Sequence, residues 1–593
     1  MSKKIRNIFN IVLLSVLAVS IMLFVMVSGW FLYVGMGALF ALLFINKAGR
    51  KVLATIVGLL VLLWLLLQTE LVQNFIVGKV TERLSNDLHT EIKIDKVSFS
   101  FFDKMDLGGV LVRDRKKDTL LYAGSLKLRI TDWFFLRDTV DLKYVGLENA
   151  SIYMHRRDSV WNYQFIADHF ASKDTTKKDS AAKAIALNIQ KVDLKKVRFV
   201  KNDEWRGQKM TFRIGSMLLD ASKTDLDNGI FNINSIDLDQ PYFALENFDG
   251  FRPEPPADTS TAIDTGMYFN EGDIKVRVAN INLSNGTFVS QVRGEVPDKN
   301  VFDGTAIKVN KINGTLKEVS FLKDTIKAKV NLDAVERSGF ELKKLKANFK
   351  FTPQMMEFAD LDIRTNTSRL GNYYAMHYKD FNEDMNDYIA KVRMDVHIKN
   401  AVVSSDDVAF FAPELSEWNK TAGINGKFHG TVDNFKVDDL FMRTGPNMYA
   451  SGTLTMKGLP DIDKTIITVD NANVLTNNEE IAFLYPDIKT IKTPDFSTLG
   501  NILYRGNFKG TINDFTATGN ISSKLGGVYS SVNMKFPKRG EPYYKGNIQT
   551  QQFDLGKFID VSSLGQISFK GKIEGRSFDV TKAKTTLDGN FDS

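Results

Sequence analysis

The sequence contains no cysteine and only 6 histidines in 593 residues. Without cysteine the chain can form no disulfide, no thiol nucleophile, no zinc ribbon and no iron–sulfur cluster. Its 6 histidines are scattered, with no i, i+4 pair and no HExxH motif, so we expect no metal site. A Gly-x-Ser-x-Gly elbow and a P-loop are also missing. These absences argue against an enzyme, and we expect no cofactor.

The charge of the chain is nearly balanced. The 77 Lys and Arg residues stand against 70 Asp and Glu residues, which gives a net charge of +7 over 593 residues. No block dense in Arg and Lys suggests an arm that binds nucleic acid. We therefore expect no nucleic-acid partner.

Long apolar runs are confined to the N-terminal segment. Residues 11–45 are almost wholly apolar, a basic patch with Lys47, Arg50 and Lys51 follows, and residues 52–67 are apolar again. One membrane-spanning helix takes about 20 residues, so the first run is nearly long enough for two crossings. This spacing predicts membrane-spanning helices at the start of the chain.

We interpret residues 1–69 as a transmembrane anchor with three spans, at 11–27, 30–45 and 52–67. Basic residues lie in 1–10 and again at 46–51, which favours a cytoplasmic position for both and export of everything after the last span. A single exporting span would leave the bulk of the chain on the same side. A cleaved signal peptide is a further alternative, but the apolar stretch is too long and no small-x-small site follows Leu67.

An amphipathic helix is predicted over residues 70–90. Its apolar positions are spaced as one face of a helix, while charged residues take the opposite face. The apolar positions are Leu71, Val72, Phe75, Ile76, Val80, Leu84 and Leu88, and the charged ones are Lys79, Glu82 and Arg83. We expect this helix to cover the first strands of a sheet, with a surface-lying membrane helix as the alternative.

From Ile92 onward apolar and polar residues alternate, which is typical of antiparallel strands that are wet on one face. Turn signals such as Asn285-Gly286 and Asn313-Gly314 separate the runs. Helical patterns are few and short, and we read about 171–184 as a disordered insertion and 253–265 as a loop. We therefore predict a mainly β fold over 91–593. The apolar face requires either a second packed layer or a sheet that curls around something apolar, and the pattern alone leaves both open.

An internal repeat is the most specific feature of the sequence. The segment NAVVSSDDVAFFAPEL at 400–415 matches NVLTNNEEIAFLYPDI at 473–488. GKFHGTVDNF at 426–435 then matches GNFKGTINDF at 506–515. Each copy is typical of a strand that runs into a capped short helix ended by proline.

The repeats extend over about 400–488 and 473–560, and a third partial copy lies at Phe569–Ile573. The chain therefore lengthens by adding equivalent units of sheet plus helix. Because the sequence stops at Ser593 in mid-repeat, we expect the repetitive β region to continue beyond the end of this chain.

Several segments together resemble a known family. They are the anchor and helix LLLQTELVQNFIVGKVTERLSNDL, the strand TEIKIDKVSFSF, the segment RDRKKDTLLYAGSLKLRI, Trp161-Asn162 after a strand, and the Gly-x-Phe/Ile-x-Gly strands of the repeat. Over roughly 60–593 the chain resembles the N-terminal part of a TamB-like protein of the AsmA superfamily, of the long type in Bacteroidetes. It departs from that family in its apolar segment 11–45, because one anchor is usual, and in lacking a C-terminal β-domain.

The resemblance implies a long antiparallel sheet curled into a β-groove (a β-taco), related in form to bridge-like lipid-transfer proteins. It implies an inner-membrane anchor with the bulk in the periplasm, and a conduit that carries phospholipid to the outer membrane for its biogenesis. A partner outer-membrane β-barrel of the TamA type would bind through the missing C-terminal region. The alternative function is a periplasmic scaffold that assists the assembly or secretion of outer-membrane β-barrels. The positions expected to line the groove and contact lipid are Val97, Phe99, Phe101, Leu126, Leu128, Ile130, Val140, Leu142, Tyr144, Ile274, Val276, Val278, Phe349, Phe351, Val392, Met394 and Val396.

The three-span topology can be tested directly because the chain has no native cysteine. We expect that Ala48→Cys stays unlabelled when a membrane-impermeant thiol reagent is added from the periplasmic side. Ser180→Cys, in the polar insertion, should be labelled under the same conditions and serves as the control. Labelling of both variants would rule out three spans and leave 11–45 without a role as a hairpin in the membrane.

Overall fold

The computed structural model describes most of the chain from residue 69 to residue 592, together with residues 51, 54–55, 58–59, 61–62 and 65–66. The gaps after residue 69 are 101–103, 131–138, 172–183, 187–188, 226–227, 254–269, 271, 485–487, 490–492, 538–539 and 578–583. The spans expected at 11–27 and 30–45, much of 52–67, and nearly all of the insertions at 171–184 and 253–265 lie outside the described residues. Within the described part, no helix is both long enough and apolar enough to cross a bilayer.

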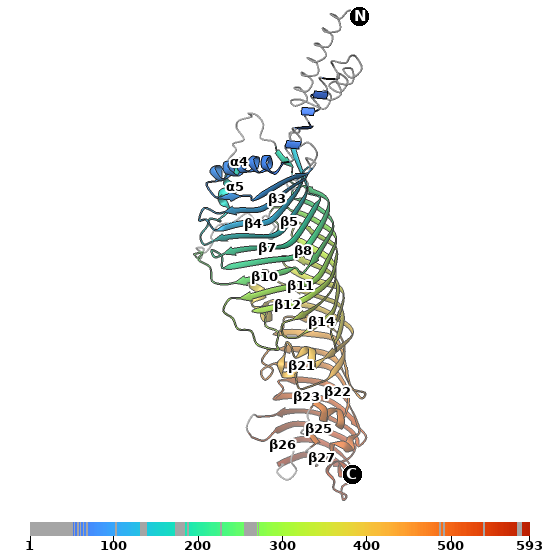
Figure 1. Ribbon diagram of the computed structural model, residues 1–593. Helices are drawn as coiled ribbons and strands as arrows, with labels where there is room; N and C mark the ends of the chain where they lie inside the picture. The colour runs from blue at the N-terminus through green and yellow to red at the C-terminus, as the bar shows by residue number, and fades with distance from the viewer. Residues whose placement is uncertain are drawn as a thin grey trace, which may run out of the picture. The chain divides into compact units, whose positions relative to one another are not determined.

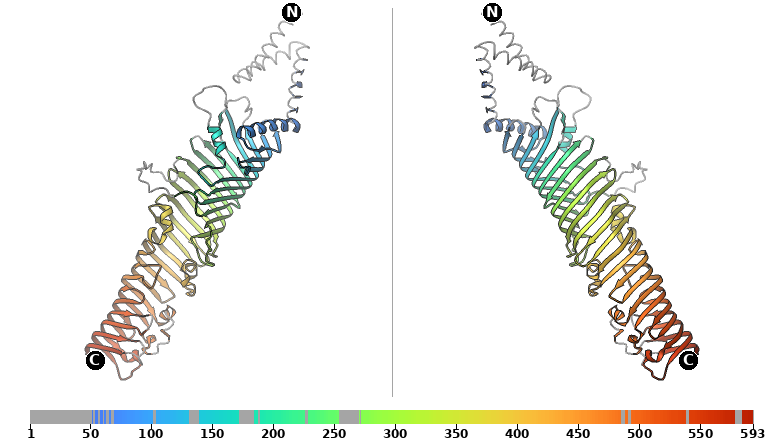
Figure 2. Two further views of the ribbon diagram at one scale, coloured as in Figure 1. Left: turned by 90° about the vertical axis from the view of Figure 1, so that its left-hand side faces the viewer. Right: turned by 90° about the vertical axis from the view of Figure 1, so that its right-hand side faces the viewer.

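The chain is mainly β, with a long sheet of many strands and few short helices, as the alternating pattern predicts. It divides into two compact units, which take their described residues from Met1–Ser260 with Ile281–Gly294 and from Thr261–Asn280 with Glu295–Ser593. In the second unit strands that follow one another in sequence lie side by side, and in the first unit most of them do (Figures 1 and 2).

The first unit contains the strands up to β10 and most of β11. Its strands are β1 (Ile92–Lys93), β2 (Lys96–Ser100), β3 (Lys104–Arg113), β4 (Thr119–Ile130), β5 (Thr139–Arg156), β6 (Ala184–Ala186), β7 (Lys191–Asp203), β8 (Gln208–Asp225), β9 (Ile230–Asp239), β10 (Tyr242–Asn247) and β11 (Lys275–Val292). Most neighbours are antiparallel, but β5 pairs with β7 in parallel and β10 pairs with β11 in parallel. The short strand β6 also pairs with β5 in parallel. The expected antiparallel sheet therefore contains parallel pairings at β5 and at β10, because the chain crosses over through α5 (Gln164–Ala171) and through the segment after β10.

A row of backbone irregularities crosses this unit. Gly109, Asn149, Lys196 and Asn285 lie in β3, β5, β7 and β11, and all have positive φ, between 52° and 63°. On either side of such a residue the alternation of side chains jumps by one, so residues three apart share a face. β-Bulges of this kind also bend a strand and increase its twist. The sequence alternation alone does not reveal them.

Helix α4 (Glu70–Leu88) corresponds to the predicted amphipathic helix and packs on the first strands (Figure 1). Its Val77 packs against a buried cluster that includes Val97, Val110 and Ala123 from three neighbouring strands. At the other end of the helix, Leu88 is buried with Leu120 and with Phe165 of α5. The side of α4 that faces the strands carries Gln73, Val77, Thr81 and Leu88, so the helix covers the start of the sheet as expected. The predicted apolar face is only partly right, because Leu71 and Phe75 are exposed.

The second unit is a regular antiparallel sheet. Its strands are β12 (Ala306–Leu322), β13 (Thr325–Glu336), β14 (Glu341–Thr352), β15 (Met355–Arg364), β16 (Arg369–His377), β17 (Arg393–Ser404), β18 (Thr421–Gly430), β19 (Asn434–Thr444), β20 (Met448–Lys457), β21 (Ile466–Asn477), β22 (Asn501–Gly510), β23 (Asp514–Ser523), β24 (Gly526–Lys535), β25 (Tyr543–Asp554), β26 (Gln566–Arg576) and β27 (Lys584–Asp592). From β12 to β27 each strand pairs with the next one in sequence. Bulges recur here too, at Asp360, Asn400, Asp439 and Asn471, where φ lies between 51° and 54°. The prediction of turns at Asn285-Gly286 and Asn313-Gly314 is wrong, because both dipeptides lie inside strands, in β11 and β12.

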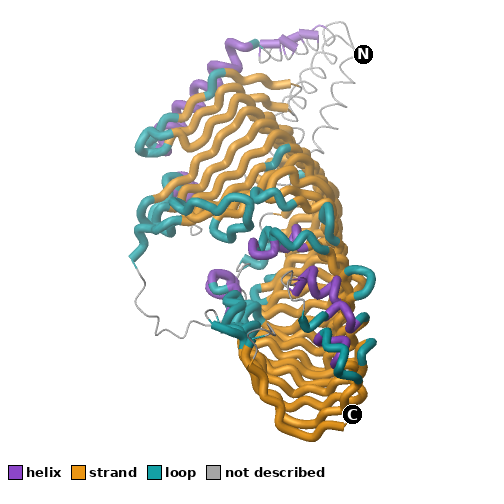
Figure 3. The backbone as a smooth tube through the Cα atoms, turned by 90° about the horizontal axis from the view of Figure 1, so that it is seen from below, coloured by secondary structure: helices purple, strands orange, loops and turns teal. Residues whose placement is uncertain are grey.

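The helices of this unit lie in the connections at the ends of the strands, where Figure 3 draws them with the loops. They are α6 (Phe381–Asn386), α7 (Tyr388–Lys391), α8 (Ser405–Val408), η2 (Pro413–Leu415), α9 (Asn478–Leu484), η4 (Phe496–Leu499) and α10 (Leu555–Ile559). α8, α9 and α10 follow β17, β21 and β25, so a helix returns at every fourth strand. The sequence repeat is therefore a unit of four strands with a helix after the first.

The three helices begin in the same way. The side chains of Ser404, Asn477 and Asp554 each accept a hydrogen bond from a backbone N–H of the first turn. Such a cap satisfies a donor that the helix itself cannot satisfy, and it fixes where the strand ends. The third copy of the repeat thus includes a capped helix that the sequence comparison did not identify.

The glycines of the repeated Gly-x-Phe/Ile-x-Gly motif permit close contact between adjacent strands. Gly430 and Gly510 have φ of +134° and +147°, which favours glycine. A Cβ at Gly510 would collide with the backbone oxygen of Asp514 and with Cα of Phe515. The open space lets a phenylalanine of the next strand approach, so that the Phe508 and Phe515 ring centroids are 4.8 Å apart.

We predict that Gly510→Ala weakens the β22–β23 hairpin by about 1–3 kcal/mol, because the methyl group meets backbone atoms and the residue must keep positive φ. Faster hydrogen exchange confined to β22 and β23 is the expected readout. Gly527→Ala is the matched control, since a Cβ there meets nothing within 4 Å. Equal exchange in both variants would contradict this account of the motif.

Candidate functional site: an apolar face of the sheet

One face of the second unit carries an apolar side chain on nearly every strand, in register. From β13 to β27 each member of this set is the direct cross-strand partner of the next. We call it the central row, and it consists of Ala328, Phe349, Phe358, Tyr374, Val396, Phe428, Val437, Leu454, Val469, Phe508, Ala517, Val532, Gly546, Ile573 and Leu587. Only Gly546 lacks an apolar side chain, so the row is nearly continuous across the described strands.

A second row runs beside the central row on the same face and is rich in methionine. Its successive cross-strand partners are Phe351, Met356, Met376, Met394, Gly430, Phe435, Met456, Ile467, Gly510, Phe515, Met534 and Tyr544. Methionine is flexible and polarizable, so it adapts to apolar surfaces of irregular shape. Such a surface suits a partner that has no fixed conformation.

The side chains of the central row are mostly half-buried. Val396, Phe428, Val437 and Phe508, for example, are neither buried nor fully exposed. A residue in the core of a two-layer protein is touched from every side, whereas these residues pack mainly against their neighbours along the sheet. The face therefore has the partial exposure expected of an apolar surface without a complete second layer.

The opposite face is polar. Successive cross-strand partners on this face are Glu357, Ala375, Asp395, His429, Lys436, Thr455, Thr468, Lys509, Thr516, Asn533, Lys545 and Glu574. All of them except Ala375 are polar or charged. Many of the charges are paired, as in the ion pair of 2.9 Å between Lys545 and Glu574. The sheet is thus apolar on one side and wet on the other.

The first unit has the same division. Leu107, Leu126, Leu147, Leu194 and Met217 are successive partners across five strands, and all except Met217 belong to or pack against one buried cluster. Beyond the row of bulges a line of larger side chains continues the same face. It comprises Ile152, Phe199, Phe212, Phe243 and Phe288, and the rings of Phe243 and Phe288 are stacked at 5.9 Å.

Two short helices lie over part of the apolar face of the second unit. In α6, the ring of Phe381 packs edge-on against Phe351 with 5.5 Å between centroids. In α7, the hydroxyl of Tyr388 lies 3.0 Å from the hydroxyl of Tyr374 in the central row. The pKa of Tyr374 is raised mainly by burial and to a smaller extent by the neighbouring Tyr388, so the phenol is neutral at physiological pH. The α6–α7 segment therefore covers the face locally.

The structure brings many of the predicted groove residues onto the apolar face. Leu126 and Leu128 are half-buried and pair with Leu147 and Val145, while Leu142 pairs with Ile130. Phe349, Phe351, Met394 and Val396 belong to the two rows, Val97 is buried in the first cluster, and Val276 is half-buried on β11. The side chains of Phe99, Ile130 and Val140, and the whole of Phe101, lie outside what is described.

Four predicted positions are placed differently. Tyr144 lies opposite Arg129, because Lys143 has no cross-strand partner on β4 and the alternation of β5 shifts by one residue there. The Tyr144 hydroxyl is 3.4 Å from the Asp193 carboxylate. Val392 is 0% exposed and precedes β17, and Val278 is only 4% exposed, so both are packed within the protein. Ile274 precedes β11 and is held in a turn by Asn270. Tyr144 is half-buried but lies on the polar side, Ile274 is exposed, and Val392 and Val278 are buried, so none of the four combines partial exposure with a place on the apolar face.

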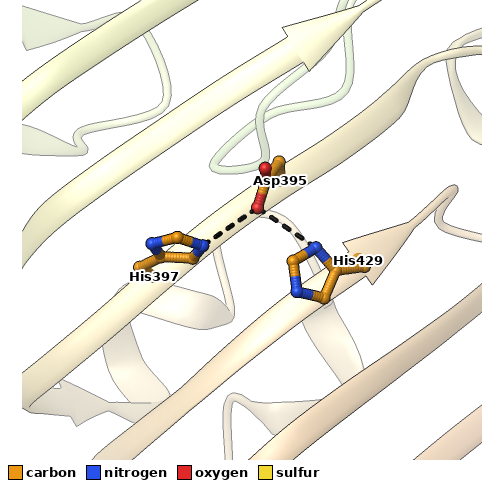
Figure 4. A group of neighbouring side chains, drawn as sticks. All are labelled: Asp395, His397 and His429. Carbon is orange, nitrogen blue, oxygen red and sulfur yellow. Dashed lines mark ion pairs between the residues drawn. The ribbon is translucent and has the colours of Figure 1, made fainter.

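A polar cluster that the sequence did not reveal lies on the opposite face. Asp395 and His397 of β17 and His429 of β18 place their ligand atoms within 4.8 Å of one another (Figure 4). The two histidines are far apart in sequence and meet only because Asp395 is the cross-strand partner of His429. Alternation in β17 is enough to predict that Asp395 and His397 share a face. The third residue, His429, could be placed beside them only once the pairing register of β17 with β18 was known.

Comparison of this chain with protein-family models, with curated proteins and with solved structures found no match.

We predict that an acid is tolerated on the central row but not in the packed interior. Val469→Asp should leave exchange protection of β20–β22 nearly unchanged, because a half-buried carboxylate keeps contact with water. Val392→Asp should cost several kcal/mol, because it buries an unpaired charge, and should release β16 and β17. Hydrogen exchange of the full chain in detergent gives both values. Global loss of protection in Val469→Asp would mean that a second layer covers the row.

Proposed function

We propose that this protein is a membrane-anchored conduit in which phospholipid moves along the apolar face of the sheet between the inner and outer membranes. The observation that carries the proposal is the in-register central row. It offers an apolar neighbour at almost every strand from β13 to β27. In this proposal the sheet is curled, so that the apolar face forms the inside of a groove.

The physical gain is the removal of water from acyl chains. An acyl chain in water costs about 0.8 kcal/mol for each exposed methylene. A continuous apolar lane lets the chain move from strand to strand without paying that cost, while the charged head group remains in solvent. No chemical step is required, and the mobile methionine side chains of the second row suit a ligand with many conformations.

Two further features support a groove over a closed sandwich. The described helices of the second unit are short and sit at intervals, as α8, α9 and α10 do after every fourth strand, so they supply no complete second layer. The bulges at Asp360, Asn400, Asp439 and Asn471 recur along the sheet, and bulges bend strands. Bent strands with an apolar inside would wrap around a lipid.

The remaining parts of the proposal come from the sequence. The apolar segments before Gln68 would anchor the chain in the inner membrane, with the bulk in the periplasm. The resemblance to TamB-like proteins agrees with lipid delivery to the outer membrane, where a TamA-type barrel would be the partner. We propose no enzymatic activity.

Site-specific photo-crosslinking tests the conduit in cells. A photo-reactive residue at Leu128 or Phe508, on the apolar faces of the two units, should capture phospholipid. The same residue at Lys127 or Lys509, which are adjacent in sequence and exposed on the polar face, should not. Capture of unfolded barrel strands in place of lipid would support the scaffold alternative and contradict the conduit.

Leu128→Asp provides the functional counterpart. Because Leu128 is half-buried on the apolar face, we expect a charge there to stop lipid delivery while the protein still accumulates at its normal level. Lys127→Asp, on the other face, should retain delivery. If the Leu128→Asp protein is degraded and no lipid is crosslinked at Leu128, the groove interpretation of this region is wrong and Leu128 lies in a packed core.

A further inference from the structure

The cluster of Asp395, His397 and His429 has the composition of a metal site on a β-sheet. His397 Nε2 lies 3.3 Å from Asp395 Oδ1, and His429 Nδ1 lies 3.1 Å from the same oxygen. Figure 4 shows both imidazole rings turned toward the carboxylate, one along β17 and the other across to β18. Three ligands therefore converge from two paired strands.

These separations match those of ligands around one zinc ion. Zinc binds imidazole nitrogen and carboxylate oxygen at about 2.0–2.2 Å in a tetrahedron, which places neighbouring ligand atoms roughly 3.3–3.5 Å apart. The two measured distances from Asp395 Oδ1 agree with this value within a few tenths of an ångström. All three ligand atoms lie within 4.8 Å of one another, so a small side-chain rotation completes the set.

The state of the shared oxygen is an independent observation. Asp395 Oδ1 is a buried atom, and among the residues that the structure describes it has no hydrogen-bond partner, although two ring nitrogens lie near it. A buried carboxylate oxygen without a donor is destabilising, because the oxygen has lost its contact with water and gained nothing in exchange. A cation placed between the oxygen and the two nitrogens would satisfy all three atoms at once.

The surroundings are compatible with a cation. Lys427 and Lys436, the cross-strand neighbours of His397 and His429, are engaged by Asp439 at 3.2 Å and by Asp438 at 2.7 Å. The ring of Tyr373 packs beside His397 at 5.3 Å between centroids and limits its rotation. The three ligand side chains are each between one third and one half exposed, so an ion can reach them from solvent.

We propose that Asp395, His397 and His429 bind a divalent transition-metal ion of the zinc class, with one coordination position left to water. The ion would tie β17 to β18 on the wet face, at the start of the first repeat. It would thereby hold the register on which the apolar row at Val396 and Phe428 depends. This site is separate from the lipid face and does not require that the chain carries lipid.

Metal titration of the full chain in detergent, first stripped with a chelator, tests the site. We expect one Zn²⁺ bound per chain, slower hydrogen exchange in β17 and β18, and a visible ligand-field band when Co²⁺ is used. His429→Gln and Asp395→Asn should weaken binding by roughly 100-fold or more, because each removes a direct ligand. His377→Gln, on the neighbouring strand β16, should bind as the native chain does.

Each outcome decides the matter without reference to lipid transport. Loss of Zn²⁺ binding in His397→Gln and His429→Gln but not in His377→Gln supports the site. Absence of binding in the native chain overturns it, as does equal binding in His429→Gln, and the cluster is then a histidine–carboxylate ion pair only. Unaltered exchange in other strands shows that the variants remain folded.

Discussion

The apolar face of this sheet depends on the register of cross-strand pairing. Side chains alternate with a period of two along a strand, so a slip of one residue would turn all the apolar residues of that strand to the charged side. Phe349, Phe358 and Tyr374 lie in line only because two consecutive hairpins, β14–β15 and β15–β16, pair them directly. Ion pairs on the wet face, capped helices and glycine–phenylalanine contacts all act at the level of the hairpin. By fixing the register of each hairpin, they maintain the separation of an apolar face from a polar face.

Alternation in the sequence was sufficient to predict strands and a two-faced sheet. It placed Phe349, Phe351, Met394 and Val396 on one face because no irregularity separates these pairs of neighbours. It failed at Tyr144, where unpaired Lys143 shifts the pattern, and at Val392, which ends a helix before the strand begins. Positive φ at Asn, Asp or Lys has only a weak local signature. Bulges therefore become visible only when both partner strands are known.

The polar cluster shows a second limit of the sequence. A metal site on one helix leaves a fixed spacing of histidines, whereas a site on a sheet has a spacing set by the loop between the strands. The segment between β17 and β18 holds α8 and η2, so His397 and His429 are separated by an irregular length of chain. A search for alternating Asp and His in one strand would have found two of the three residues, Asp395 and His397. The register supplies the remainder.

The four-strand repeat has a consequence for how such a chain can evolve in length. Strands of an antiparallel sheet end alternately on two opposite sides, so the addition of an even number of strands brings the chain back to the side on which it started. For this reason α8, α9 and α10, which follow β17, β21 and β25, all lie on the same side of their sheet. At about 4.8 Å between strands, one whole repeat adds roughly 19 Å. Duplication of a repeat therefore extends the sheet in fixed steps and keeps the helices at the same ends of the strands. Gain or loss of a single strand would reverse the direction of every later strand and move the later helices to the opposite ends.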